Sequence, residues 1–404
     1  MDAAMPKDDV WMLALVGGLV IAAVLTRRLS DLLKLPAIVG YMLIGLGIGV
    51  ADARWSFLSE PDRFSFAFLA DAGIVVLLFR VGLESNFTRL MAQIRRASFV
   101  WVGDFVVSFA VAYGVASQVL GYGLVPSLVA ASALSATSLG VAAAFWRDRG
   151  ALKTDRGALL TDIAELDDLS GILALAVMLA VLPRLLDGGT VGPEVIGEVT
   201  LVLLVKFFAF CAFCFLFARY LERPITGWFR ATQPRPTVII VVLGLCFAIS
   251  TLADFMGFSL AVGALFAGLA FSRDPAEHSI DKGFEYLFLL FSPFFFIHLG
   301  MVADPSLWIE GLAVGGVLAV AAIVGKLVGV GGATWMVADR KTAILIGISM
   351  IPRAEITLVI LQQAAALGPA AVPGELFGGM IFVSILTCLL VPFALQLAFR
   401  RHGA

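Results

Sequence analysis

The stretch TDIAELDDLSGILALAVML, residues 161–179, contains four carboxylates in a segment that is otherwise apolar. Its length and its richness in Leu, Ala and Ile predict a helix, and a helix this apolar is buried in a protein core or in a membrane. Ionised side chains are costly at membrane depth, so their presence there indicates an ion or proton pathway. The segment therefore predicts a functional helix with the carboxylates Asp162, Glu165, Asp167 and Asp168.

Asp167 and Asp168 lie close to the middle of this helix. Adjacent helical residues point about 100° apart, so one carboxylate can face a cavity while the other faces a neighbouring helix. Carboxylates bind hard monovalent cations and exchange them for protons when burial and mutual repulsion favour the protonated form. We expect a pair that binds a cation and carries protons, with a structural ion pair as the alternative. Asp162 and Glu165 lie nearer the cytoplasmic end and are candidates for an access funnel.

The composition of the whole chain indicates a membrane protein. Of its 404 residues 60% are hydrophobic and 14% charged, and the mean hydropathy is +0.99. Soluble proteins carry about 25% charged residues. The net charge of −2 indicates neither a basic face for nucleic acid nor an acidic tail. We expect an all-α polytopic membrane protein that forms one membrane unit over 1–404, with the lipid bilayer as its surroundings and no nucleic-acid partner.

Apolar runs separated by charged or Gly- and Pro-rich breaks predict 13 transmembrane helices. They lie near residues 10–26, 35–51, 64–84, 97–119, 123–146, 157–183, 196–218, 236–253, 257–272, 284–303, 309–338, 342–367 and 375–399. The connections after odd-numbered spans hold 20 of the 28 Lys and Arg residues, and the other side holds 4. Because cytoplasmic loops collect basic residues, we expect the N-terminus outside and the C-terminus in the cytoplasm.

The remaining basic residues fall inside predicted spans: Arg80, Lys206, Lys326 and Arg353. Lys326 is the single charge in the run AVAAIVGKLVGVGG, so we expect it to pair with one of the two adjacent aspartates. Such a pair releases a proton if a cation takes the carboxylate, or it serves as a structural bridge. Lys206 lies near the end of its span and is expected to reach an interface.

Two predicted spans contain residues that interrupt a helix. The fifth contains the small residues Ser135, Ala136, Thr137 and Ser138, and the twelfth contains Pro352. Discontinuous helices at matching places in two halves indicate the binding site of a transporter. Spans one to six and eight to thirteen then form two six-helix repeats that are inverted in the membrane, with span seven, 196–218, as a linker helix.

The chain resembles the sodium/proton branch of the second family of monovalent cation:proton antiporters over essentially its whole length. The resemblance rests on LLFRVGLES (77–85), SATSLGVAAA (135–144), AELDDLSGI (164–172), SLAVGALFAGLAFS (259–272), FSPFFFIHLGMVAD (291–304), VGKLVG (324–329) and MIPRAEITLVI (350–360). The aspartate pair, the isolated lysine and the Pro-Arg-x-Glu element are specific in combination.

This resemblance implies a NhaA/NapA-like fold in which a core domain moves like an elevator against a scaffold that forms a homodimer. The core would comprise 97–183 and 309–399, and the scaffold 1–90 and 236–304. Several residue roles are implied in the same way: Asp168 as the principal ion and proton carrier, Asp167 as the partner of Lys326, Thr137 and Ser138 as lining of the ion site, and Pro352, Arg353 and Glu355 as support of the helix crossover.

Three residues depart from the family pattern or stand apart from it. Ala354 replaces the usual glycine between Arg353 and Glu355, which helix geometry tolerates. Arg80 occupies a position that tends to be apolar, and we expect its side chain to extend to the membrane interface rather than to take part in ion access. His298 is interpreted as a core histidine rather than a pH sensor.

The resulting functional hypothesis is electrogenic exchange of cytoplasmic Na⁺, or Li⁺, for external H⁺ in the plasma membrane of a prokaryote, serving pH homeostasis. No enzyme activity and no cofactor are expected. The nearest alternative is K⁺/H⁺ exchange or K⁺ efflux, as in Kef-type relatives. Those usually carry a nucleotide-binding domain, and no G-x-G-x-x-G follows the last predicted span. An ion channel or a sodium-coupled solute transporter is the alternative of another class, and a separate regulatory subunit is left open.

Overall fold

The computed structural model of the chain describes residues 7–33, 35–84, 87–152, 154–186, 193–232, 235–272, 277–303 and 308–402. Within those ranges all regular secondary structure is helical. The α-helices are α1 (Lys7–Leu33), α2 (Ala37–Trp55), α3 (Glu60–Glu84), α4 (Phe87–Gly114), α5 (Leu124–Ser135), α6 (Leu139–Asp148), α7 (Asp155–Leu186), α8 (Pro193–Leu216), α9 (Glu222–Thr232), α10 (Arg235–Phe255), α11 (Leu260–Phe271), α12 (Glu277–Val302), α13 (Trp308–Lys326), α14 (Gly332–Val337), α15 (Arg340–Ser349), α16 (Glu355–Ala365) and α17 (Gly374–His402). Helices α4, α8 and α13 continue into the π-helical turns η1 (Val115–Val119), η2 (Phe217–Leu221) and η4 (Leu327–Gly331).

In the part of the chain that the structure describes, nine helices are long and apolar enough to cross a membrane. The other predicted spans fall on α8, on the shorter apolar helix α11 and on two interrupted helices, α5 with α6 and α15 with α16. The all-helical, multi-pass architecture is thus confirmed. The count of thirteen spans and the inversion of two halves stay predictions.

Two elements differ from the sequence-based boundaries. Helix α4 begins at Phe87 rather than near 97, so it starts in what was predicted to be a connection. Helix α9, ERPITGWFRAT, was not predicted at all. It mixes Arg223 and Thr226 with Ile225, Trp228 and Phe229, a pattern typical of a helix that lies along a surface rather than across a membrane. Its apolar residues are too few to resemble a span, which is why hydropathy alone missed it.

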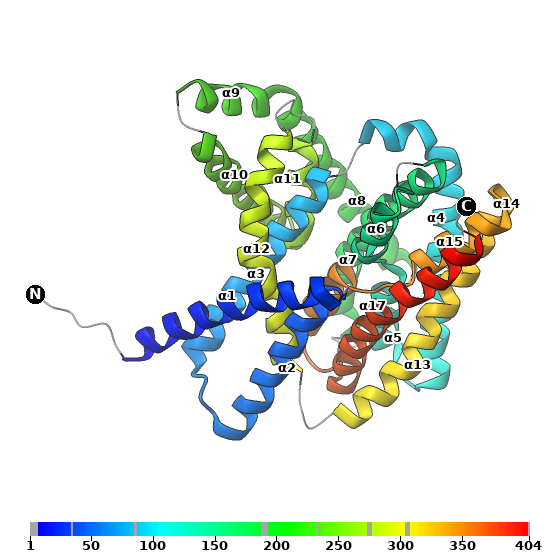
Figure 1. Ribbon diagram of the computed structural model, residues 1–404, viewed down its shortest axis with the longest axis horizontal. Helices are drawn as coiled ribbons and strands as arrows, with labels where there is room; N and C mark the ends of the chain where they lie inside the picture. Colours follow the sequence, from blue (N-terminus) through cyan, green and yellow to red (C-terminus); the bar gives the residue numbers. More distant parts are fainter. Residues whose placement is uncertain are drawn as a thin grey trace, which may run out of the picture.

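The helices form two groups that pack mainly within themselves (Figure 1). In the first group α3 packs on α11 and α12, α2 packs on α12, and α10 packs on α11. In the second group α4 packs on α5, α7 and α13, and α17 packs on α13 and α15. Helix α8 contacts both α7 and α11 and so joins the groups. Whether one group is a dimerisation scaffold and the other a moving core stays a prediction.

Glycines bring helix backbones of the first group into direct contact. A Cβ added to Gly45 of α2 would lie 2.0 Å from the carbonyl oxygen of Ile297 in α12. One added to Gly300 of α12 would lie 2.3 Å from the carbonyl oxygen of Met42. The two glycines therefore face each other, with no side chain between the helices, which is the close packing that small residues permit in membranes.

The same arrangement recurs between α3 and α11. A Cβ on Gly82 would lie 2.1 Å from the carbonyl oxygen of Leu265, and one on Gly268 would lie 2.1 Å from that of Phe79. Phe79 itself stacks on Phe284 of α12 with ring centroids 4.4 Å apart. These contacts fix the positions of α2, α3, α11 and α12 relative to one another.

Helix α15, the first half of an interrupted helix, has a well-formed start. The Asp339 side chain accepts a hydrogen bond from the Thr342 backbone N–H (3.4 Å) and another from the Thr342 hydroxyl. The hydroxyl hydrogen bond holds the pKa of Asp339 below its usual range, so this cap stays ionised at moderately acidic pH. Arg156 at the start of α7 contacts the same carboxylate at 3.5 Å.

We expect Gly45→Leu to destabilise the protein by about 3 kcal/mol, because the added side chain meets backbone that cannot move aside. The matched control is Gly47→Leu on the same helix, since a Cβ at Gly47 meets no atom within 4 Å. Thermal unfolding in detergent should show a lower midpoint for Gly45→Leu and an unchanged one for Gly47→Leu. Equal midpoints for both variants would contradict the close α2–α12 contact.

Candidate ion-binding site

The two interrupted helices cross at their breaks. Helix α5 ends at Ser135 and α6 begins at Leu139, whereas α15 ends at Ser349 and α16 begins at Glu355. The backbone N–H of Ser138 donates to the carbonyl oxygen of Pro352 (2.9 Å), and the Thr137 hydroxyl donates to the carbonyl oxygen of Met350 (3.3 Å). The discontinuities predicted from small residues and from Pro352 are therefore present, and they lie against each other.

Arg353 supplies hydrogen bonds that the broken helices lack. Its side chain is fully buried, and its Nη1 donates to the carbonyl oxygen of Ala136 and to Thr137 Oγ1 (3.1 Å). The Thr357 hydroxyl donates to the same Ala136 carbonyl at 3.4 Å. A break inside a membrane is tolerated only where other groups satisfy the freed backbone, and Arg353 performs that task here. Support of the crossover, the role that the resemblance implied for Arg353, stays a prediction.

Glu355, at the second break, also connects the two breaks, through a hydrogen bond to a residue of the first. It is the first residue of α16, where the helix dipole favours a negative charge, and it accepts a hydrogen bond from the Ser138 hydroxyl. Thr137 and Ser138 thus contact residues of the Pro-Arg-x-Glu element, which lies at the second break. The structure brings Thr137, Ser138, Pro352, Arg353 and Glu355 together.

Lys326 lies against this crossover with three acceptors. Its Nζ is 2.6 Å from Asp104 Oδ2, 2.7 Å from the carbonyl oxygen of Ser135 and 3.2 Å from Asp167 Oδ2. Lys326, Asp104 and Asp167 each have 0% exposed side chains. The predicted pairing of Lys326 with an aspartate of α7 is present in this geometry, since Asp167 is one of its partners.

Asp104 was missed in the sequence analysis. It lies in ASFVWVGDFVVSFAVAYG of α4 as the lone ionisable acid of an apolar stretch, which is the criterion that singled out Lys326. Its second oxygen, Oδ1, accepts a hydrogen bond from the Ser108 hydroxyl at 2.9 Å. Applying one criterion to acids and bases alike would have identified it, although its partner would have remained unknown.

Asp168 and Asp167 differ in their surroundings. Asp167 is buried and its Oδ1 has no hydrogen-bond partner among the residues described. Asp168 is half-buried and lies within electrostatic range of Glu355 and Lys326. Within the described residues no three His, Cys, Asp or Glu side chains converge as metal ligands.

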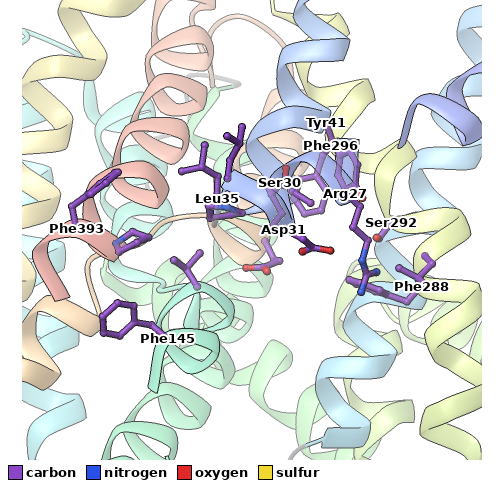
Figure 2. A pocket seen from close by; sticks show the side chains of 18 of the residues that line it. Arg27, Ser30, Asp31, Leu35, Tyr41, Phe145, Phe288, Ser292, Phe296 and Phe393 are labelled. Carbon is purple, nitrogen blue, oxygen red and sulfur yellow. The ribbon is translucent and has the colours of Figure 1, made fainter. Parts of the chain in front are cut away.

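A cavity of about 800 Å³ separates the two helix groups and reaches the crossover at Glu355. Figure 2 shows Arg27, Ser30 and Asp31 of α1 on one side of it and Phe145 and Phe393 on the other. Arg27 and Asp31 belong to the C-terminal part of α1, and Phe393 to the C-terminal part of α17. The cavity thus approaches the site from the end of the bundle where α1 and α17 both finish.

Asp162 and Glu165 lie on α7 before Asp168, but neither lines this cavity, which is lined instead by Asp31 and Glu355. Asp162 is buried and Glu165 half-buried. Their role as an access funnel stays a prediction.

The other singled-out side chains lie away from the crossover. The Arg80 guanidinium stacks 4.8 Å from the ring centroid of Phe288, which lines the cavity. His298 lines a separate cavity of about 260 Å³ beside Asp52 and Arg63, which form an ion pair. The Lys206 Nζ lies near Gly257, just after the end of α10, rather than inside the site.

Residues 18–401 match the family described as sodium/hydrogen exchanger, transmembrane. The chain belongs to the sodium/hydrogen exchanger family. Among relatives, it is 27% identical to a Na⁺/H⁺ antiporter of Enterococcus hirae over 94% of this chain and 95% of that protein. It is 26% identical to the Na⁺/H⁺-K⁺ antiporter GerN of Bacillus cereus over 93% of each chain. The resemblance inferred from the motifs is confirmed.

The fold of this exchanger is shared with a solved structure. The sodium proton antiporter MjNhaP1 of Methanocaldococcus jannaschii superposes with a TM-score of 0.76, at 17% identity, over 98% of this chain and 100% of that one. The family is one of membrane antiporters and not of enzymes, as the sequence analysis predicted.

The cavity predicts that its lining residues are accessible to water in the exchanger. In a variant with Cys211, Cys214, Cys246 and Cys388 replaced by Ala, we expect Gln396→Cys to react with a membrane-impermeant thiol reagent, since Gln396 lines the cavity. Ser250→Cys on α10, with 0% exposure, is the control and should stay unlabelled. Labelling of Gln396→Cys is expected in vesicles of one orientation only. Labelling in neither or in both orientations contradicts a cavity open at one end.

Proposed function

We propose that this exchanger moves cytoplasmic Na⁺ outward against external H⁺ and that Asp168 carries both ions in turn. The observation that carries the proposal is the position of the Asp167–Asp168 pair beside two crossed helix breaks and a buried Lys326. Breaks of this kind expose backbone oxygen atoms that coordinate cations. Na⁺ and H⁺ then compete for one carboxylate, and competition for one site is what couples the two fluxes.

The balance of charge supports the binding of cations. Within the described crossover region the carboxylates outnumber the basic groups, since Asp104, Asp167, Asp168 and Glu355 lie near Lys326 and Arg353. Excess negative charge in a low-dielectric site is offset by taking up Na⁺ or protons. A site that always needs either Na⁺ or protons favours the exchange of one for the other over the release of Na⁺ alone.

Lys326 gives the exchange its proposed electrogenic character. Sodium bound at Asp168 and Asp167 displaces Lys326 from the 3.2 Å contact with Asp167, and the freed ammonium passes its proton on. Two protons then enter for each Na⁺ that leaves. One net charge crosses the membrane per cycle, which is worth about 2.3 kcal/mol per 100 mV.

Alternating access is proposed to arise from movement of the second helix group along the first, as in an elevator. The cavity between the two groups, with Glu355 at its inner end, supports this arrangement. The basic residues Arg27 and Arg149 line it, and basic residues mark the cytoplasmic side. We accordingly propose an inward-open state in the plasma membrane of a prokaryote, with the N-terminus outside, the C-terminus in the cytoplasm and a homodimer through the first group.

Potassium is the second candidate ion, because GerN, one of the relatives, is described as a Na⁺/H⁺-K⁺ antiporter. Carboxylate, hydroxyl and carbonyl oxygens serve both ions, so the same residues support either exchange.

The decisive experiment reconstitutes the wild type and Asp168→Asn in proteoliposomes and follows a lumenal pH dye after addition of Na⁺, Li⁺ or K⁺. We expect Na⁺-driven proton movement in the wild type and a loss of at least about 100-fold in Asp168→Asn, since the amide binds no exchangeable proton. Asp254→Asn is the matched control, because Asp254 is an exposed acid of α10 outside the site. Proton movement with K⁺ but not with Na⁺ or Li⁺ would identify K⁺ as the transported cation. No proton movement with any of the three cations would refute antiport.

A second prediction concerns the charge moved. With Lys326→Gln, exchange is expected to continue at a lower rate but to lose its response to an imposed membrane potential, because only one proton carrier is left. The measurement compares the Na⁺-driven pH change at zero and at negative-inside potential. Unchanged voltage dependence in Lys326→Gln would show that the lysine is a structural bridge rather than a carrier.

A further inference from the structure

Lys326 has two carboxylate partners on different helices, and these differ in their distance from Lys326 and in their other hydrogen bonds. The contact with Asp104 of α4 is 2.6 Å, whereas that with Asp167 of α7 is 3.2 Å. Asp104 is also fully satisfied, since Oδ2 accepts from Lys326 and Oδ1 from the Ser108 hydroxyl. Asp167 keeps one oxygen, Oδ1, without a hydrogen-bond partner among the described residues. We therefore expect the shorter contact, that of Lys326 with the better satisfied Asp104, to persist when one of the two contacts is broken.

The backbones of α4 and α13 are built to hold Asp104 at Lys326. Gly325 and Gly329 flank the lysine one helical turn apart and both face α4. A Cβ on Gly329 would lie 3.1 Å from the Cα of Asp104, and one on Gly325 would lie 3.1 Å from the Cα of Ser108. The π-helical turn η4 begins directly after Lys326, a local irregularity that often accompanies functional positions.

Asp167 has the opposite character. It sits on α7 next to Asp168, the proposed Na⁺ carrier, so it neighbours a group that is proposed to change partner in every cycle. A cation that recruits Asp167 must separate it from Lys326. In a low-dielectric site an ammonium without a counter-ion is strongly unfavourable. The separation of Asp167 from Lys326 is therefore energetically accessible only if another carboxylate stays with the lysine.

We propose that Asp104 is the resident counter-ion of Lys326, a positioning residue that pairs with the displaced ammonium on α13 when Na⁺ takes Asp167, until the lysine passes its proton on, and again when the lysine is reprotonated. The inference rests on the proposed function and extends it. The side-chain contacts of Asp104 are with Lys326 and Ser108. Asp104 acts through Lys326, by removing the electrostatic penalty that would otherwise oppose the binding of Na⁺.

Asp104→Asn tests the proposal, because the amide oxygen can still accept from Lys326 and the amide NH2 can donate to the Ser108 hydroxyl, while the charge is removed. In proteoliposomes we expect the Na⁺ concentration for half-maximal exchange to rise by roughly tenfold or more, the factor expected when a charged hydrogen bond is lost. The maximal rate should stay within about twofold. Ser108→Ala is the matched control, since it removes the other partner of Asp104 and leaves the charge, and its Na⁺ curve should match the wild type.

A double-mutant cycle separates this role from a purely structural one. If Asp104 acts through Lys326, then Asp104→Asn has less than a twofold effect on the Na⁺ curve in a Lys326→Gln background. A general loss of packing would lower the maximal rate or the unfolding midpoint equally in both backgrounds. If Asp104→Asn alone does not fold, the double variant, which removes both charges, provides the comparison with Lys326→Gln.

The outcomes distinguish the two proposals. An Asp104→Asn curve that matches the wild type, or an effect of equal size in the Lys326→Gln background, overturns the role of Asp104 and leaves the antiport in place. A wild type without Na⁺-driven proton movement overturns the proposed function, and this inference with it. A selective rise in the half-maximal Na⁺ concentration that disappears without Lys326 supports both.

Discussion

The structure depends on the need to satisfy backbone groups where two helices are broken inside an apolar protein. At such a break, carbonyl and N–H groups lose their helical partners, and no water is at hand to replace them. Arg353 meets this need with its guanidinium on the Ala136 carbonyl, and Ser138 meets it with its N–H on the Pro352 carbonyl. The site exists because those bonds allow four helix ends to meet at one point. Lys326 also donates to a carbonyl at the first break, that of Ser135, so both buried cations bond backbone oxygens there.

Glu355 connects the crossover to the cavity. Glu355 begins α16, accepts the Ser138 hydroxyl and lines the cavity between the helix groups. The Glu355 side chain thus lies both at the breaks and at the cavity wall. Lys326 and its two aspartates lie on α13, α4 and α7, so the charged centre belongs wholly to the second group. If the second group is the part that moves, a cation bound at this centre moves with it.

Much of this arrangement was accessible from the sequence, because apolar surroundings make a single charge conspicuous. Lys326 and the Asp167–Asp168 pair were recognised for this reason, and Pro352 and the run Ser135–Ser138 indicated the breaks. Which aspartate the lysine contacts came from the family resemblance rather than from spacing. Asp104 was passed over because the criterion of a lone charge was applied to the basic residues only, and one sequence carries no sign of a contact between residues 222 positions apart. Helix α9 was missed because amphipathic helices lack the long apolar run that hydropathy detects.

The glycine contacts of the first helix group have a mechanical consequence. Where Gly45 meets Gly300 and Gly82 meets Gly268, backbone rests on backbone, and no flexible layer of side chains lies between the helices. A layer of side chains can shear by changing rotamers, whereas two backbones in contact must separate before they slide. These four helices accordingly behave as one stiff plate. Under the proposed elevator movement, the stroke would fall at the boundary that holds the cavity, and this plate would be the fixed reference for it.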